Sequence, residues 1–243
     1  VKGDDSHPEI EGRSVARIDT ADYLTADNGW LIATNDVAGT MQGLSPGSSS
    51  VTWKRDDLPG VRHVVGSGTR LYVVLPSERR VLVIDRATGK TLDEGKVDGI
   101  PWAVAVSGNQ VAVALASENT IVMFEADHLY PAGTIVTTSA STAITAAAGD
   151  LWAYHPSEHI LEAVAGPQRG DRIATRSEQP VFASNGSILA IGGVEMVTTL
   201  RPTGQVHRNV YLLRHPAKMA VTRAGDVLAA TGNTLVFVRA SLG

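Results

Sequence analysis

Five side chains that could bind a ligand stand at matching points along this chain: Asp22, Tyr23, Arg62, Trp102 and Lys218. Each lies six or seven residues before a glycine that follows a short apolar stretch. An arginine can hold a carboxylate or a phosphate through two parallel hydrogen bonds, and a tryptophan can stack on a ligand ring. The set predicts a binding site if the fold brings the stretches together. The alternative is that Trp102 and Tyr23 pack between structural units while the charged groups reach solvent.

The equivalence of these residues depends on an alignment of the stretches on their glycines. That alignment places six residues at one equivalent position: Tyr23, Arg62, Trp102, Ala143, Pro180 and Met219. The preceding position holds Asp22, Val61, Pro101, Thr142, Gln179 and Lys218.

A second regular feature is the pair Ser-Glu, which occurs at 77–78, 117–118 and 157–158. Each of these glutamates follows a regularly spaced aliphatic residue by seven positions, and Glu195 follows Ile188 by the same seven without a preceding serine. The acidic set therefore comprises Glu78, Glu118, Glu158 and Glu195. Serine is an ordinary turn residue, whereas four carboxylates on one rim could attract a cation or a basic partner. The structural interpretation of the pairs, as parts of a repeated turn, is favoured.

Other candidate chemistry has weaker support. His155 and His159 could share one face of a helix and bind zinc, but Pro156 between them indicates a turn, which removes that geometry. Seven histidines are scattered, and His63 lies among apolar neighbours, typical of a core or channel histidine. No G-x-S-x-G motif is present, and the glycine-rich stretches lack the lysine of a phosphate loop. We therefore expect no metal, no cofactor and no assigned catalytic residue.

Composition narrows the possible partners. The 243 residues contain 25 acidic and 21 basic side chains and no basic run, which argues against a nucleic-acid groove. There is no cysteine, so disulfide, zinc-thiolate and thiol-nucleophile chemistry are excluded. No apolar run reaches the roughly 20 residues that span a bilayer. The polar start VKGDDSHPEIEGR indicates a linker over residues 1–13 of a chain cut from a longer or processed protein.

The elements that would position these residues follow from an internal repeat. The aliphatic anchors Leu31, Leu71, Val111, Leu151, Ile188 and Val227 each follow a glycine turn, at separations of 40, 40, 40, 37 and 39 residues. Each unit reads as an apolar strand, the glycine turn, a second strand, a polar turn, a third strand such as RVLVID or TIVMFE, and a fourth strand. Four short strands in about 40 residues are typical of a β-propeller blade.

The repeat predicts an all-β fold over residues 14–243, a six-bladed β-propeller with four-stranded blades. The last unit stops after its third strand, and Ser14 to Thr20 supply a surplus strand at the other end. We expect this N-terminal segment to pair with Thr234 to Ala240 and complete the last blade, because closure removes an open sheet edge. An open β-solenoid and two sandwiches are the alternatives.

The stretches GIPWAVAVSGNQVAVA and HPAKMAVTRAGDVLAA resemble the NHL and YncE-like group of propellers, and VLVIDRATGKTL resembles the blade end of that group. WD40 and Kelch are disfavoured because no blade carries a Trp-Asp pair and Gly-Gly occurs once. The resemblance implies a rigid, often extracytoplasmic scaffold that binds ligands or partners on one face. It implies no single activity.

We therefore predict a noncatalytic domain that binds an unknown protein or small molecule and no nucleic acid. It would act outside the cytoplasm, joined to a membrane only through a tether beyond this fragment. The alternative is a propeller lyase or hydrolase with its site at the mouth of the central channel. The resemblance implies a His-Glu cluster from several blades for such an enzyme, whereas the repeated polar set here is mostly Glu, which favours binding.

Overall fold

The computed structural model describes residues 21–48, 50–175, 181–184, 189–192, 196–200, 206–211, 218–221, 227–231 and 234–238. These residues form five four-stranded sheets and one three-stranded sheet, each an antiparallel meander in chain order. Between strands, the described ranges add one short 3₁₀ helix, η1 (Pro76–Glu78). The all-β prediction and the four-stranded repeat are confirmed.

The strands of the first three sheets are β1 (Tyr23–Asp27), β2 (Trp30–Asn35), β3 (Thr40–Leu44), β4 (Trp53–Arg55); β5 (His63–Ser67), β6 (Arg70–Leu75), β7 (Arg80–Asp85), β8 (Thr91–Lys96); and β9 (Pro101–Ser107), β10 (Gln110–Leu115), β11 (Thr120–Glu125), β12 (Pro131–Val136). Those of the last three are β13 (Ala143–Ala147), β14 (Asp150–His155), β15 (Ile160–Ala165), β16 (Arg172–Ala174); β17 (Val181–Ser184), β18 (Leu189–Gly192), β19 (Met196–Leu200), β20 (Val206–Tyr211); and β21 (Lys218–Val221), β22 (Val227–Thr231), β23 (Thr234–Val238).

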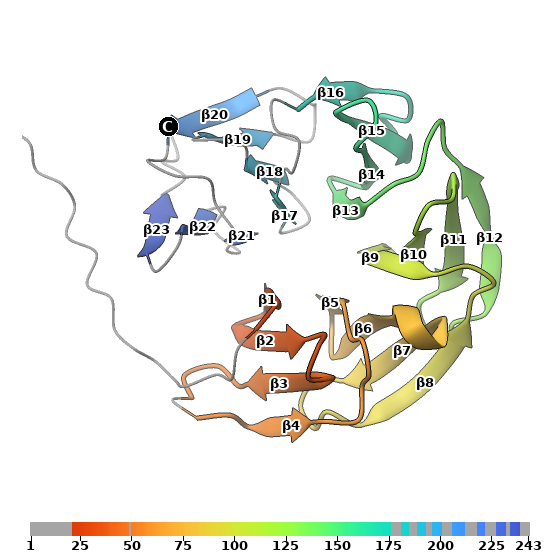
Figure 1. Ribbon diagram of the computed structural model, residues 1–243. Helices are drawn as coiled ribbons and strands as arrows, with labels where there is room; N and C mark the ends of the chain where they lie inside the picture. The colour runs from red at the N-terminus through yellow and green to blue at the C-terminus, as the bar shows by residue number, and fades with distance from the viewer. Residues whose placement is uncertain are drawn as a thin grey trace, which may run out of the picture.

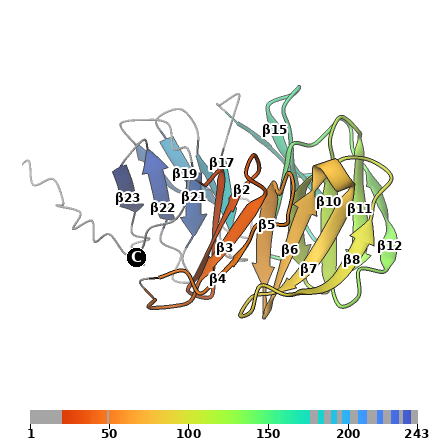
Figure 2. The ribbon, with the colours of Figure 1, turned by 60° about the horizontal axis from the view of Figure 1, so that its bottom comes forward.

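The sheets stand around a common centre, with the first strand of each sheet innermost (Figure 1). The first strands contact one another in sequence, β1 with β5, β5 with β9, β9 with β13, β13 with β17, and β17 with β21. β21 also contacts β1, which brings the two ends of the series together. Seen from the side, the strands run roughly along the central axis (Figure 2). This arrangement is that of a β-propeller.

One face of the ring, which we call the entrance face, carries the beginnings of the first strands and the turns between second and third strands. The register of β1 on β2, in which Tyr23 lies opposite Thr34, places both features at the same end of the sheet. The corresponding register recurs where His63 lies opposite Val74 and Ala143 lies opposite Tyr154. The repeat therefore presents equivalent residues from successive sheets on the entrance face.

The core lies between sheets. Apolar residues of the second and third sheets, among them Tyr72, Val83, Val113 and Phe124, form one buried cluster. Three further clusters join the first sheet to the second, the third to the fourth, and the fourth to the fifth. β-branched residues alternate along these strands and fit such half-buried, pleated surfaces. Each sheet thus depends on its neighbours for burial of its faces.

Trp53 ties the first sheet to the second. Its Nε1–H donates to the carbonyl oxygen of Arg86 at 2.8 Å, across the boundary between the sheets. The indole ring occupies the space that a side chain at Gly43 or Gly89 would need. Two glycines are therefore required here by close packing against one aromatic ring.

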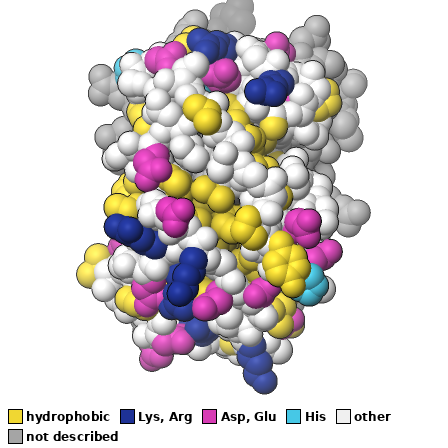
Figure 3. All heavy atoms as spheres, turned by 90° about the vertical axis from the view of Figure 1, so that its right-hand side faces the viewer, with side chains coloured by type: hydrophobic (Ala, Val, Ile, Leu, Met, Phe, Trp, Pro, Cys, Tyr) yellow, Lys and Arg dark blue, Asp and Glu magenta, His cyan; other side chains and the backbone are white. Residues whose placement is uncertain are grey.

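The outer side of the ring near the third sheet mixes apolar and charged side chains (Figure 3). Exposed large apolar residues near the second and third outer strands include Leu92, Tyr130 and Val136. Within the described ranges, no helix has the length and apolar character needed to cross a membrane. The predicted closing strand, Ser14 to Thr20, lies outside the described residues, as does the linker at 1–13, so both stay predictions.

Candidate functional site

The structure brings three of the five predicted site residues together on the entrance face. Tyr23 begins β1, Arg62 directly precedes β5, and Trp102 is the second residue of β9, so the three come from successive first strands. The Arg62 guanidinium carbon lies 3.2 Å from the centre of the Trp102 ring and 5.5 Å from that of Tyr23. Arg62 thus contacts two aromatic rings, an arrangement that a cation favours.

The glycine alignment is wrong by one residue for the first and fourth sheets. Strand register makes Tyr23 equivalent to His63, Ala103 and Ala143, because each lies four residues before the last pair of its hairpin. The position that Arg62 and Trp102 occupy is held by Asp22 in the first sheet and Thr142 in the fourth. The cause is the turn itself, where the glycine with positive φ is the second turn residue at Gly29 and Gly149 but the first at Gly68 and Gly108.

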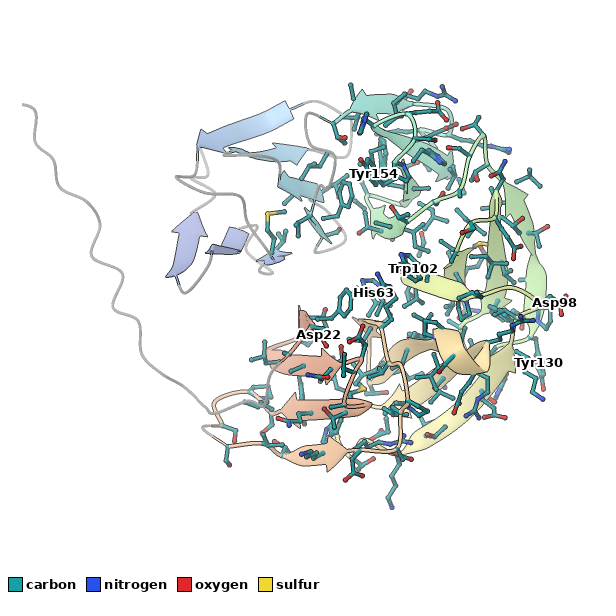
Figure 4. All side chains as sticks on the ribbon, viewed as in Figure 1. Asp22, His63, Asp98, Trp102, Tyr130 and Tyr154 are labelled. Atoms are coloured by element: carbon teal, nitrogen blue, oxygen red, sulfur yellow. The ribbon has the colours of Figure 1, made fainter. Side chains whose placement is uncertain are left out.

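Backbone hydrogen bonds support this correction. The N–H groups of Asp22, Arg62 and Thr142 donate to the carbonyl oxygens of Thr34, Val74 and Tyr154, respectively, at 2.8, 3.2 and 3.1 Å. Donors and acceptors are each spaced by exact multiples of the 40-residue repeat. Asp22, Arg62, Trp102 and Thr142 are therefore the equivalent side chains at the mouth of the central channel. Figure 4 shows Asp22 and Trp102 beside the centre of the ring.

Of the remaining predicted residues, Asp22 is exposed and lies next to Tyr23. Its Oδ2 accepts a hydrogen bond from the backbone N–H of Asp36 at 3.0 Å, which holds the turn between β2 and β3. Lys218 is the first residue of β21, opposite Ala230, and so lies at the start of a first strand as expected.

His63, the residue after Arg62, connects the strand that follows Arg62 to the strand that carries Trp102. Its Nδ1 accepts a hydrogen bond from the backbone N–H of Val104 at 3.2 Å, so it joins β5 to β9. Its ring meets that of Tyr23 edge to face, with centres 6.2 Å apart. Burial, and secondarily the positive charge of Arg62, lowers the pKa of His63 to about 4. His63 is therefore neutral near pH 7 and acts as an acceptor, in agreement with the interpretation as a channel histidine.

The Tyr23 hydroxyl also responds to this environment. Burial raises the pKa of Tyr23 above its ordinary value, Arg62 opposes that rise, and the carboxylates of Asp36 and Asp22 add to it. The phenol thus stays protonated at neutral pH. Arg62, His63, Tyr23 and Trp102 therefore bring together a cation, a neutral imidazole, a neutral phenol and an indole beside Asp22.

A pocket of about 300 Å³ opens beside Arg62 and is lined by Asp36, Val37, Gly60, Arg62, Pro76, Ser77 and Trp102. The lining comes from two turns of the entrance face and from the beginnings of two first strands. Val37 is 94% exposed, so its side chain stands at the opening. Ser77 Oγ donates to the carbonyl oxygen of Pro59 at 2.9 Å and holds the second turn against the segment before Arg62.

Sequence reasoning missed Asp36, Val37 and Pro76 as parts of this site. A signal was present, because Asp36 follows the anchor Leu31 by the same five residues by which Pro76 follows Leu71. Both positions fall in the turns of the entrance face.

The Ser-Glu pairs have a common structural role in the described part of the chain. In the second sheet Ser77 bonds to Pro59; in the third, the Glu118 carboxylate packs over Gly99, where a side chain would clash with it. In the fourth sheet Glu158 Oε1 accepts hydrogen bonds from Thr138 Oγ1 and Ser139 Oγ at 3.2 and 3.1 Å. Each pair thus joins the turn after the second strand to the segment that leads into the first strand of the same sheet.

Glu78 and Glu158 also form bonds with neighbouring side chains. Glu78 forms an ion pair with Arg80, which bonds Glu94 at 2.6 Å as well. Hydrogen bonds from Ser139, and then Thr138, lower the pKa of Glu158. Glu195 lies outside the described residues. These contacts support the structural interpretation of the pairs, while an acidic rim for a partner stays a prediction.

His155 and His159 do not form a joint ligand pair. His155 is fully buried, with Nδ1 3.1 Å from the carbonyl oxygen of Ser139, whereas His159 occupies a turn with φ of 53° and is exposed. No group of three His, Cys, Asp or Glu side chains that could hold a metal occurs in the ranges that the structure covers.

The sequence matches no protein-family model, and no curated protein sequence matches it significantly. Solved structures with similar backbones include the Neurospora crassa Pan2 WD40 domain, with a TM-score of 0.66 and 9% identity over 86% of this chain and 75% of that one. Streptogramin B lyase gives a TM-score of 0.64 at 13% identity, covering 89% and 81%. BamB from Moraxella catarrhalis gives 0.55 at 14% identity, covering 88% and 70%. At such identities these likenesses concern the backbone alone, and they show that this chain has a β-propeller fold.

Proposed function

We propose that this chain is a noncatalytic binding propeller whose ligand or partner segment enters the pocket beside Arg62 and Trp102. The observation that carries the proposal is the guanidinium stacked on Trp102 at the edge of a 300 Å³ pocket. Pockets of this size, with an apolar lining and a few convergent polar groups, are typical of small-ligand sites. Of the described histidines, His63 is nearest in sequence to Arg62, and it is held by Val104 with a lowered pKa, which favours binding over acid–base chemistry.

The proposal is tested with protein labelled with ¹⁵N at its four tryptophans and titrated with small acids, amines, phosphate esters and neutral amides. We expect at least one class to shift the Trp102 indole N–H signal saturably, and Trp102→Phe assigns that signal. Trp152 is 3% exposed within a core cluster and serves as the internal control. Equal shifts of both signals, or no shift of Trp102 with any class, would contradict a binding pocket. Consumption of a probe would support the lyase or hydrolase alternative.

We infer further that the propeller has six blades and that residues 14–20 complete the last one. The three-stranded sheet β21–β22–β23 has one strand fewer than the other five sheets, which supports this closure. Because the chain has no cysteine, introduced pairs report proximity directly. Arg17→Cys, combined in turn with Leu235→Cys, Val236→Cys and Phe237→Cys, is expected to form an internal disulfide in at least one pair. Arg17→Cys with Thr91→Cys, on the second sheet, is the control, and closure is wrong if no pair exceeds it.

We also propose that the chain belongs with NHL and YncE-like propellers and works outside the cytoplasm as part of a larger membrane-anchored protein. The sequence stretches that resemble that group support the first point, and one of them forms β9 and β10. The absence of cysteine is compatible with an oxidising exterior and supports the second.

A further inference from the structure

Among the described residues, Arg62 differs from several other arginines in having no carboxylate partner. Several described arginines are bound to carboxylates: Arg55 to Asp57, Arg70 to Asp127, Arg80 to Glu78 and Arg172 to Glu162. Within the described ranges, the Arg62 guanidinium contacts the rings of Trp102 and Tyr23 and forms no ion pair with a carboxylate. Stacking on Trp102 occupies a face of the guanidinium, whereas acceptors bind in its plane. The contact with Trp102 thus orients the Arg62 guanidinium and leaves the N–H groups in its plane for an acceptor.

The walls of the pocket favour an apolar group next to that acceptor. Val37, Pro76 and the Trp102 ring supply apolar surface, and Val37 is almost fully exposed. The cavity volume of about 300 Å³ is at the lower end of the range for small-ligand sites, so the bound group is small. The ligand portion that fits is therefore an anionic group with a short or branched apolar chain.

Local charge selects among anions. Arg62 is the one cation in the lining, and Asp36 lines the same pocket. A second carboxylate lies beside the pocket, because Asp22 accepts a hydrogen bond from the backbone N–H of Asp36. A phosphate monoester carries nearly two negative charges at neutral pH and would meet repulsion that one guanidinium does not offset. A carboxylate carries one charge and matches the guanidinium through two parallel hydrogen bonds.

We propose that the pocket binds a monocarboxylate with a small apolar substituent, with the carboxylate on the edge of Arg62 and the substituent between Val37, Pro76 and Trp102. This inference rests on the proposed binding function. The same chemistry occurs in a free branched-chain acid and in the C-terminus of a peptide that ends in an apolar residue. Both sources present one carboxylate beside an apolar group.

The test compares acids with their neutral amides through the Trp102 indole signal. The probes are 4-methylpentanoate with 4-methylpentanamide, and N-acetyl-leucine with N-acetyl-leucinamide. We expect each acid to bind about tenfold more tightly than its amide, since a hydrogen-bonded charge pair is lost. Arg62→Gln should abolish that difference. Arg79→Gln is the matched control, because Arg79 is on the same face outside the lining, and it should preserve the difference.

The possible outcomes distinguish the source of the carboxylate from the chemical class of the ligand. Tighter binding of N-acetyl-leucine than of 4-methylpentanoate supports a peptide C-terminus, and the reverse supports a free acid. Amides that bind as well as acids, or an acid preference that survives in Arg62→Gln, would overturn the inference. If isopentyl phosphate or isopentylamine shifts Trp102 while the acids do not, the carboxylate class is wrong and the binding function stands. If no probe shifts Trp102, both fail.

Discussion

Replacing Phe124 by alanine is expected to lower the free energy of unfolding by about 4 kcal/mol, as for other large buried aromatic residues. Phe124 is 2% exposed and belongs to the buried cluster between the second and third sheets, with Tyr72 and Val113. Its loss removes apolar contact across the boundary on which Arg62 and Trp102 also depend. Urea unfolding followed by circular dichroism measures the change.

The control is Leu92→Ala, because Leu92 is 55% exposed on β8 of the second sheet. A surface truncation of this kind usually changes stability by less than about 0.5 kcal/mol. Similar losses in the two variants would show that burial between sheets does not dominate the stability of this fold.

Acidification is expected to destabilise the protein through His63 by about 2 kcal/mol between pH 6.5 and pH 4. The pKa of His63 is lowered from 6.5 to about 4 in the folded protein. The unfolded chain therefore binds the proton first, and the stabilisation is fully present above about pH 6.5 and is lost as the pH falls toward 4. The full shift corresponds to about 3 kcal/mol, and we expect less because His63 is only partly buried by its solvent-accessible surface.

The comparison that isolates His63 is His63→Gln, whose amide oxygen can still accept the Val104 N–H. Carboxylates such as Asp57 and Glu158 titrate in both proteins, so their contributions cancel in the difference. Urea midpoints measured at intervals from pH 4 to pH 7 should fall more steeply in the natural sequence. Equal slopes would show that His63 protonation is not linked to folding. The Trp102 signal should change over the same pH range, because Val104 is two residues away on β9.

The sequence was most informative where the repeat is strict. The strands predicted from RVLVID and TIVMFE coincide with β7 (Arg80–Asp85) and β11 (Thr120–Glu125). Alternating β-branched residues between turns carry this information locally, so no knowledge of distant contacts was required. The 40-residue spacing of aliphatic anchors likewise predicted the equivalence of the first four sheets correctly.

Glycine was a less reliable marker than the aliphatic anchors. A two-residue hairpin turn can place its glycine first or second, and both versions occur here at Gly68 and Gly29. A shift of one residue along a strand reverses the face on which a side chain lies. Because the glycine is the second turn residue at Gly29, the alignment on glycines paired Tyr23 with Arg62. The strand register instead makes Tyr23 equivalent to His63 and Asp22 equivalent to Arg62.

The sequence by itself determined the period, the strand order within each sheet and the positions that reach the entrance face, because these depend on neighbours along the chain. Only the tertiary structure decided which side chains meet. The stacking of Arg62 on Trp102 and the pocket that Asp36 and Pro76 share join residues from different sheets. Such contacts depend on how one sheet is placed against the next, and packing between sheets, not local periodicity, sets that placement.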